Sequence, residues 1–200
     1  SLDAAYRLNV RGTGTGTITC EFDDDHNATL EWDTWGPCAF NIGIIEGSPG
    51  QGTTLLRTKG LKDRLAELKS GVTVIASQTA DWNPVKARDV AQAFLTAHGK
   101  NLVGLFAQDD NSGAAAAEVL KSQSRADVKA VGTGGTKNGL AAIRSGLMYG
   151  TMDQSPTADA KQALELAIAI AKGQMPAQKR NIIPMPKITA ANVAGFAGEW

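Results

Sequence analysis

The chain has 200 residues, enough for one well-packed domain or for two very small ones. Hydrophobic residues make up 42% of it and charged residues 20%, so it can bury a core and is not disordered as a whole. Its 20 Lys and Arg balance its 20 Asp and Glu, and this neutrality removes the basic surface that a nucleic acid or an anionic membrane would attract.

Residues 1–41 differ in composition from the rest of the chain. They hold seven acidic residues and two basic ones, both cysteines and a Gly-Thr repeat, and they show no helical period. We therefore expect an atypical acidic segment over residues 1–41, richer in strand than in helix, and a second domain over residues 42–200. Cys20 and Cys38 are too few for a disulfide scaffold, and the sequence leaves open whether they form one bridge or stay free thiols.

The run Asp-Asp-Asp-His at residues 23–26 contains residue types that bind metals. Consecutive residues cannot all converge on one ion, so a solvated loop explains the run better. We predict no metal site and no cofactor. We also predict that the chain is not an enzyme, because no motif pairs a nucleophile with a general base.

From residue 43 onward, short runs of β-branched and apolar residues alternate with longer amphipathic stretches. This alternation is typical of βα units, which form a parallel sheet flanked by helices. We predict an α/β fold of the flavodoxin-like or Rossmann-like type, in which ligands bind beyond the carboxyl ends of the strands. The predicted strands are residues 43–46, 72–77, 102–107, 128–132 and 149–153, and the predicted helices are residues 55–68, 84–99, 114–120, 139–144 and 158–171.

The first of these helices carries five leucines at helical spacing, which predicts a surface helix lying on the sheet. It follows a Gly-rich turn at residues 46–54 that nearly matches the phosphate-binding loop G-x-x-x-x-G-K-[ST]. Thr53 stands at the lysine position, so the ammonium that would neutralise the phosphates is missing. Only this near match favours a nucleotide-dependent enzyme, and we expect an ordinary βα turn.

Polar and aromatic side chains follow three of the predicted strands. Trp82 comes after the second strand, between Asp81 and Asn83. An indole at this edge can stack on the C–H face of a sugar, or it can cover the core above a capped helix start, and the sequence leaves both interpretations open. The third strand ends in an acceptor-rich run that contains Asp109, and the fifth ends in one that contains Gln154.

Five short motifs occur in one order along the second domain. They are residues 44–47 (Ile-Ile-Glu-Gly) with 57–60 (Arg-Thr-Lys-Gly), 76–82 (Ala-Ser-Gln-Thr-Ala-Asp-Trp), 106–110 (Phe-Ala-Gln-Asp-Asp), 131–136 (Val-Gly-Thr-Gly-Gly-Thr) and 153–156 (Asp-Gln-Ser-Pro). With these motifs at matching spacing, the chain from about residue 41 to its end resembles the ribose-type periplasmic sugar-binding proteins of ABC transporters, a branch of the type I solute-binding fold.

The resemblance implies a two-lobed protein that closes on a sugar, of which this chain holds mainly the C-terminal lobe. It implies a monosaccharide or a related small polar solute as ligand, the membrane component of an ABC transporter as partner, and a periplasmic or other extracytoplasmic location. A carboxylate that the family places after the fourth strand falls here on Gly134. The implied ligand-binding residues are Arg57 or Lys59, which share a turn, with Trp82, Asp109 and Gln154.

The resemblance also implies that most of the first lobe is absent, because residues 1–41 match nothing in it. In the family, the helix at residues 158–171 belongs to that lobe. Its apolar stripe must then be covered by residues 1–41, by the lobe's own exposed face or by a second copy, and we predict a homo-oligomer.

Two other functions stay open. One is an effector-binding or interaction domain of the LacI-like type. It would lack the DNA-binding region, because residues 1–41 have neither the basic charge nor the helical period of such a region. The other is a fragment that binds nothing. The abrupt change in composition at residue 41 would also follow from a gene rearrangement or a change of reading frame.

Overall fold

The computed structural model describes residues 17–22, 28–33, 40–178 and 181–200, with the backbone alone for the first two ranges. The chain divides into two compact units, Ser1–Ala39 and Phe40–Trp200. In the first unit, β1 (Thr17–Phe22) pairs antiparallel with β2 (Ala28–Asp33). The Asp-Asp-Asp-His run and the side chains of Cys20 and Cys38 lie outside the described residues.

The second unit is built on a six-stranded sheet of order β4-β3-β5-β6-β7-β8. Neighbouring strands run parallel, except that β8 pairs antiparallel with β7. The predicted α/β fold is confirmed. Strand β8, which has three residues of which only Ile188 is buried, was not predicted. The strands are β3 (Phe40–Glu46), β4 (Val72–Thr79), β5 (Leu102–Ala107), β6 (Lys129–Val131), β7 (Gly150–Met152) and β8 (Lys187–Thr189).

Side-chain caps fix where four of the helices begin. Asn83 accepts hydrogen bonds from two backbone N–H groups of α2, and Asp109, Thr136 and Ser155 do the same for one N–H group each of α3, α4 and α5. The cap at Asp109 starts α3 four residues before the predicted position. The helices are α1 (Gly52–Leu68), α2 (Pro84–His98), α3 (Asp110–Ser122), α4 (Lys137–Arg144) and α5 (Pro156–Ala171), with 3₁₀ turns η2 (Gly99–Asn101) and η3 (Val193–Gly195).

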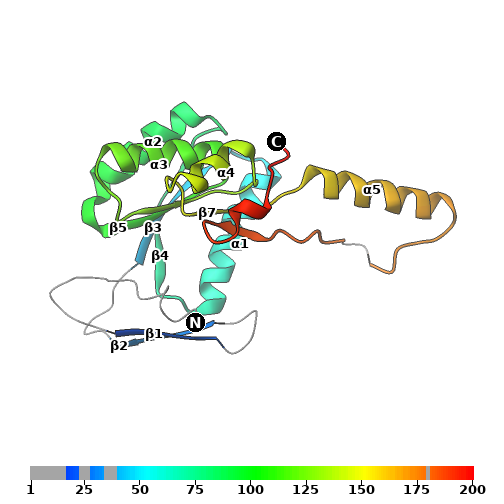
Figure 1. The fold of residues 1–200 in the computed structure, drawn as a ribbon, viewed down its shortest axis with the longest axis horizontal. Coiled ribbons are helices and arrows are strands. Elements are labelled where there is room, and N and C mark those ends of the chain that lie inside the picture. Colours follow the sequence, from blue (N-terminus) through cyan, green and yellow to red (C-terminus); the bar gives the residue numbers. More distant parts are fainter. Residues whose placement is uncertain (1–16, 23–27, 34–39, 179–180) are drawn as a thin grey trace. The chain divides into compact units, whose positions relative to one another are not determined.

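The core of the second unit lies between the sheet and α2, α3 and α4, which lie together on one side of it (Figure 1). Small residues allow close approach here. A Cβ at Gly43 of β3 would lie 2.6 Å from Cδ2 of Phe94 on α2, so glycine is what lets this helix pack directly on the central strand. Four consecutive buried alanines, residues 114–117, do the same for α3. This packing fixes the carboxyl ends of the central strands.

Helices α1 and α5 are far less buried than the other three. Leu61 and Leu65 of α1 are half-buried, but Leu55, Leu56 and Leu68 are 58%, 69% and 55% exposed. The expectation that the leucines of α1 all pack on the sheet is therefore wrong for three of the five. Helix α5 has no buried residue. Within the described residues, no helix is long and apolar enough to cross a membrane.

Candidate ligand-binding site

Three of the side chains predicted to bind a ligand meet at the carboxyl ends of the strands. Arg57 comes from α1, Trp82 follows β4 and Gln154 follows β7. One guanidinium nitrogen of Arg57, Nη2, donates to Oε1 of Gln154 at 2.7 Å, and the guanidinium carbon lies 5.8 Å from the centroid of the Trp82 ring. That distance permits a cation–π interaction. The fold thus brings together a cation, an aromatic ring and an amide from residues that are up to 97 positions apart in sequence.

Asp109 lies at the same edge but has a second role. Its Oδ1 accepts a hydrogen bond from the backbone N–H of Ser112 at 2.9 Å and so caps α3.

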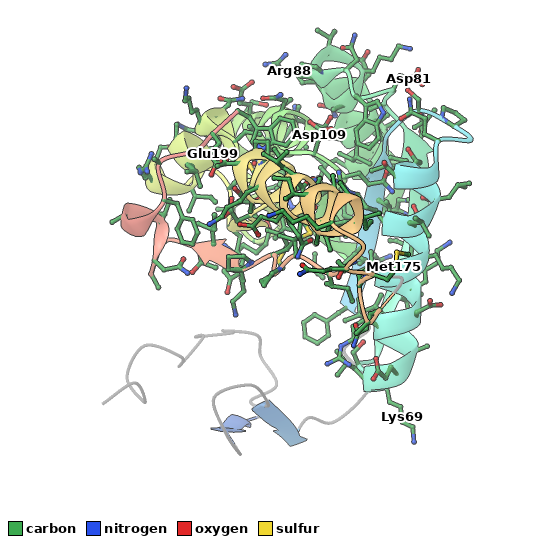
Figure 2. All side chains as sticks on the ribbon, turned by 90° about the vertical axis from the view of Figure 1, so that its right-hand side faces the viewer. Lys69, Asp81, Arg88, Asp109, Met175 and Glu199 are labelled. Carbon is green, nitrogen blue, oxygen red and sulfur yellow. The ribbon has the colours of Figure 1, made fainter. Side chains whose placement is uncertain are left out.

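Burial lowers the pKa of Arg57, and the negative charges of Asp109 and Asp110 oppose this shift. In Figure 2, Asp109 and Asp81 lie towards one end of the unit and Lys69, the C-cap of α1, lies at the opposite end.

Lys59, the alternative to Arg57, lies elsewhere on α1. Its ammonium pairs with Asp63 one turn further along the helix, and both side chains are exposed. Two residues correspond to more than half a turn of helix, so Lys59 and Arg57 project to different sides. Of the two candidates, the structure brings Arg57 to the cluster.

The backbone at Trp82 is strained. Asp81 and Trp82 have φ values of 54° and 58°, in the left-handed region that residues with a side chain seldom adopt. Each such residue costs of order 1 kcal/mol or more and persists only where the surroundings impose it. Here the indole N–H donates to Oε1 of Gln51 at 2.6 Å, and the hydroxyl of Thr79 donates to the carbonyl of Gly47 at 2.5 Å.

Gly47 is the surface on which the indole rests. A Cβ at this position would lie 2.0 Å from Cζ2 of Trp82. Any other residue would push the ring away, because real Cβ atoms do not approach other heavy atoms so closely. The structure therefore adds Gly47 and Gln51 to the site. In the sequence both stand in the Gly-rich turn, and Gly47 also ends the motif at residues 44–47, but neither pattern predicts a contact with Trp82.

Gln108 lies beneath the cluster and is completely buried. Its Oε1 accepts from the backbone N–H of Gly47 at 2.9 Å, and its Nε2 donates to the carbonyl of Thr54 at 3.0 Å and to Oγ1 of Thr58 at 2.7 Å. Its own carbonyl accepts from Nη1 of Arg57. In the sequence, Gln108 is recognisable only as a polar residue directly after an apolar strand. No local pattern indicates its hydrogen-bonding partners.

Asp110, the first residue of α3, is a buried carboxylate behind the strand ends. It accepts hydrogen bonds from the hydroxyl of Thr151 and from the backbone N–H of Thr136, the latter at 2.7 Å. Burial raises its pKa, and these hydrogen bonds partly offset the rise. A Cβ at Gly139 would lie 2.3 Å from its Oδ2, so glycine leaves the room for this carboxylate.

Gly134 stands where the resemblance leads one to expect a ligand-binding carboxylate. It pairs through a parallel bridge with Asp153, whose Oδ1 lies 2.3 Å from where a Cβ of Gly135 would be. Burial is the main cause that raises the pKa of Asp153, and the nearby charges of Glu199 and Asp110 add to it. A carboxylate is thus present beside Gly134, supplied by the residue that directly follows β7.

The assembled edge is suited to recognition of a neutral, polyhydroxylated molecule. It offers guanidinium and amide donors, carboxylate acceptors and an aromatic ring. Among the described residues, no three His, Cys, Asp or Glu side chains are placed to hold a metal ion.

Comparison with known proteins identifies the family. The profile of the periplasmic binding protein domain matches residues 28–175, which is most of the chain. The chain belongs to the periplasmic binding protein domain family. The match begins within the first unit, before the boundary that composition predicts at residue 41.

Two curated relatives are named for the molecules they bind. The chain is 33% identical over 153 residues to a xylitol-binding protein of Mycolicibacterium smegmatis, covering 76% of this chain and 43% of that protein. It is 33% identical over 131 residues to the ribose import binding protein of Salmonella typhimurium, covering 66% and 44%. The chain therefore spans less than half the length of either. Both names describe binding proteins and not enzymes.

Solved structures of binding proteins superpose on most of this chain. A solute-binding protein of an ABC transporter from Actinobacillus succinogenes, with bound D-allose, superposes with a TM-score of 0.69 at 25% identity, covering 78% of this chain and 54% of that one. One from Bacillus halodurans, with bound myo-inositol, gives 0.67 at 23% identity, covering 79% and 54%. These similarities show that the second unit has the type I periplasmic binding fold, as the sequence analysis predicted.

Proposed function

We propose that this chain is the sugar-binding lobe of a periplasmic solute-binding protein that serves an ABC transporter. Its ligand is a monosaccharide or a related polyol, its protein partner is the membrane component of the transporter, and it works outside the cytoplasm without catalysing a reaction. The observation that carries the proposal is the convergence of Arg57, Trp82 and Gln154 at the carboxyl ends of a parallel sheet.

Each member of this cluster suits a different part of a sugar. The indole of Trp82 matches the apolar C–H face of a ring, and the unused N–H groups of Arg57 and Gln154 match hydroxyls. Asp109 keeps one carboxylate oxygen beyond the cap of α3 and can accept from a hydroxyl. The relatives named for ribose and xylitol, and the structures holding D-allose and myo-inositol, support a polyhydroxylated ligand.

A lobe acting alone should bind weakly. Half of the ligand would keep water as its hydrogen-bonding partner and the aromatic ring would stack on one side only, so less polar complementarity is buried. We therefore place the affinity of this chain by itself well below that of a two-lobed protein.

Calorimetric titration against D-ribose, D-allose, xylitol and myo-inositol tests the proposal. We expect heat with at least one of them, and we expect Arg57→Ala to weaken that binding by about tenfold to a hundredfold, since hydrogen bonds to a charged group are lost. Lys59→Ala is the matched control, because it removes the same charge from an exposed position on the same helix. Absence of heat with every sugar at millimolar concentration, or equal losses in the two variants, would contradict the proposal.

We further propose that the chain self-associates. The supporting observation is the exposed apolar stripe of α5, where Leu164 and Ile168 are 62% and 45% exposed. An apolar helix face of this kind is normally covered in soluble proteins. The occupant we propose is a second copy of the chain.

A further inference from the structure

Gln108 is a fully buried amide in which every hydrogen-bonding atom of the side chain has a partner. The partners come from the turn after β3 and from two successive positions on one face of α1, at sequence separations of 61, 54 and 50 residues. A buried polar group with all its partners in place fixes one arrangement of the elements that it joins. Gln108 thus locks α1 and the turn before it onto the end of β5.

The same residue contacts the supports of both ligand-facing groups. Its backbone carbonyl accepts from Nη1 of Arg57, which leaves Nη2 directed at Gln154. Its side-chain oxygen holds the N–H of Gly47, the glycine on which the indole of Trp82 rests. One residue therefore sets the position of the guanidinium through its main chain and the position of the indole through its side chain.

We propose that Gln108 is a positioning residue for the ligand site. It holds Arg57 and Trp82 in the arrangement that binds a sugar, and it does not contact the sugar itself. This inference rests on the proposed sugar-binding function. It goes beyond a role in stability, because it predicts that a change at Gln108 moves Arg57 and Trp82 in the ligand-free chain.

The hydrogen-bond pattern requires an amide at this position. The N–H of Gly47 needs an acceptor, while the carbonyl of Thr54 needs a donor. The hydroxyl of Thr58 also needs a donor at its oxygen, because its own proton goes to Oε1 of Glu46 at 2.9 Å. A carboxylate could satisfy Gly47 but would face the Thr54 carbonyl with no proton to offer. Gln108→Glu is therefore a near-isosteric change that removes the donors and keeps the acceptor.

The test measures the indole N–H resonance of Trp82 and the Nε–H resonance of Arg57 in the ligand-free, ¹⁵N-labelled chain. The resonances are assigned by their loss in Trp82→Phe and Arg57→Ala. We expect Gln108→Glu to shift both signals and, in calorimetry, to weaken sugar binding about tenfold, the effect of losing roughly one buried hydrogen bond. Lowering the pH protonates the new carboxyl and restores one donor, so both signals should move back towards their original positions.

The matched control is Gln92→Glu, the same chemical change at an exposed position on α2. It should leave both resonances and the affinity unchanged. If Gln108→Glu does not fold, Thr58→Val removes one partner of the same amide and should shift the same two signals by less. Unchanged signals in whichever of the two variants folds would overturn the proposal, even if the melting temperature fell.

The two proposals fail in distinguishable ways. If the parent chain binds no sugar, the proposed function fails, while the resonances of Trp82 and Arg57 still decide whether Gln108 positions them. If sugar binds and Gln108→Glu leaves the affinity and both signals unchanged, the function stands and the positioning role is wrong.

Discussion

The indole of Trp82 is held by its neighbours in a conformation that the backbone does not prefer. Two consecutive left-handed residues, Asp81 and Trp82, stay in place because the ring is bound by Gln51 and rests on Gly47. Strain of this kind is typical of functional positions, where a fixed geometry is worth its energetic cost. At the residue scale the site is therefore preorganised.

Gly47→Ala tests this preorganisation. The new methyl would overlap Cζ2 of Trp82, so the ring must move off its support. We expect a loss of about 1–3 kcal/mol in the free energy of unfolding, the usual cost of overpacking, and greater quenching of Trp82 fluorescence by iodide. Fluorescence from the other tryptophans is subtracted with Trp82→Phe.

Gly60→Ala is the matched control for the same methyl addition. Gly60 lies inside α1 with nothing within 4 Å of a Cβ, so alanine should stabilise the helix by about 0.5–1 kcal/mol and leave the quenching unchanged. Quenching of Trp82 that stays the same in Gly47→Ala would contradict the arrangement described for the ring.

The buried carboxyl of Asp110 should make stability depend on pH. Its pKa in the folded chain is raised above the ordinary value of 3.8, chiefly by burial, so between these two values the folded state holds more protons than the unfolded state. The free energy of unfolding contributed by this group is therefore largest below pH 3.8 and falls as the pH rises through the raised pKa.

Denaturant unfolding between pH 4 and pH 7 measures this dependence. Asp110→Asn keeps an oxygen for the N–H of Thr136 but cannot ionise, so its stability should fall less steeply with rising pH than that of the parent chain. Asp89→Asn, a change to an exposed carboxyl on α2, should leave the slope unchanged. A steeper fall in Asp110→Asn would show that the assigned direction of the pKa shift is wrong.

At the scale of the element, helices α2 and α3 differ from α1 and α5 in what covers them. Helix α3 buries eight of its 13 residues, and α5 buries none of its 16. Helix propensity alone stabilises an isolated helix of this length only marginally. Beyond the cap at Ser155 and the hydrogen bond from the backbone N–H of Thr157 to Glu199, both in its first turn, α5 gains little from its own chain. Burial of its stripe against a second copy would supply the missing stabilisation.

The double variant Leu164→Ser with Ile168→Ser tests this contact. We expect sedimentation of the parent chain to show a dimer or larger species, and that of the variant to shift towards the monomer. Because both side chains are exposed within the chain, the unfolding free energy of the monomer should change by no more than about 0.5–1 kcal/mol.

Lys172→Ser, an exposed polar change at the C-cap of the same helix, is the control and should not alter the sedimentation. A parent chain that is monomeric at all concentrations, with the stripe still exposed, would remove the case for self-association.

At the scale of the whole molecule, the sequence predicted the parallel α/β arrangement of the second unit and all five of its parallel strands. It succeeded there because the strands read as short runs of β-branched and apolar residues, and because polar caps and prolines mark the helix starts. It missed β8 because a three-residue strand with one buried residue carries no periodic signal.

The sequence also pointed to four of the side chains at the candidate site. Trp82, Asp109 and Gln154 each come shortly after a strand, whereas Arg57 lies in α1. All four belong to motifs that match the family. Their positions could be predicted from order along the chain, since the carboxyl ends of parallel strands share one edge of the sheet.

What the sequence by itself determined is the fold class, the family and the residue types present at that edge, because periodicity, caps and motifs are local. Only the tertiary structure placed Arg57, and not Lys59, beside Trp82 and Gln154. It also revealed the strained backbone at Trp82 and the hydrogen bonds that join Gln108 to Arg57 and to Gly47. Those properties depend on contacts between residues 31 or more positions apart, through hydrogen bonds whose partners no local pattern specifies.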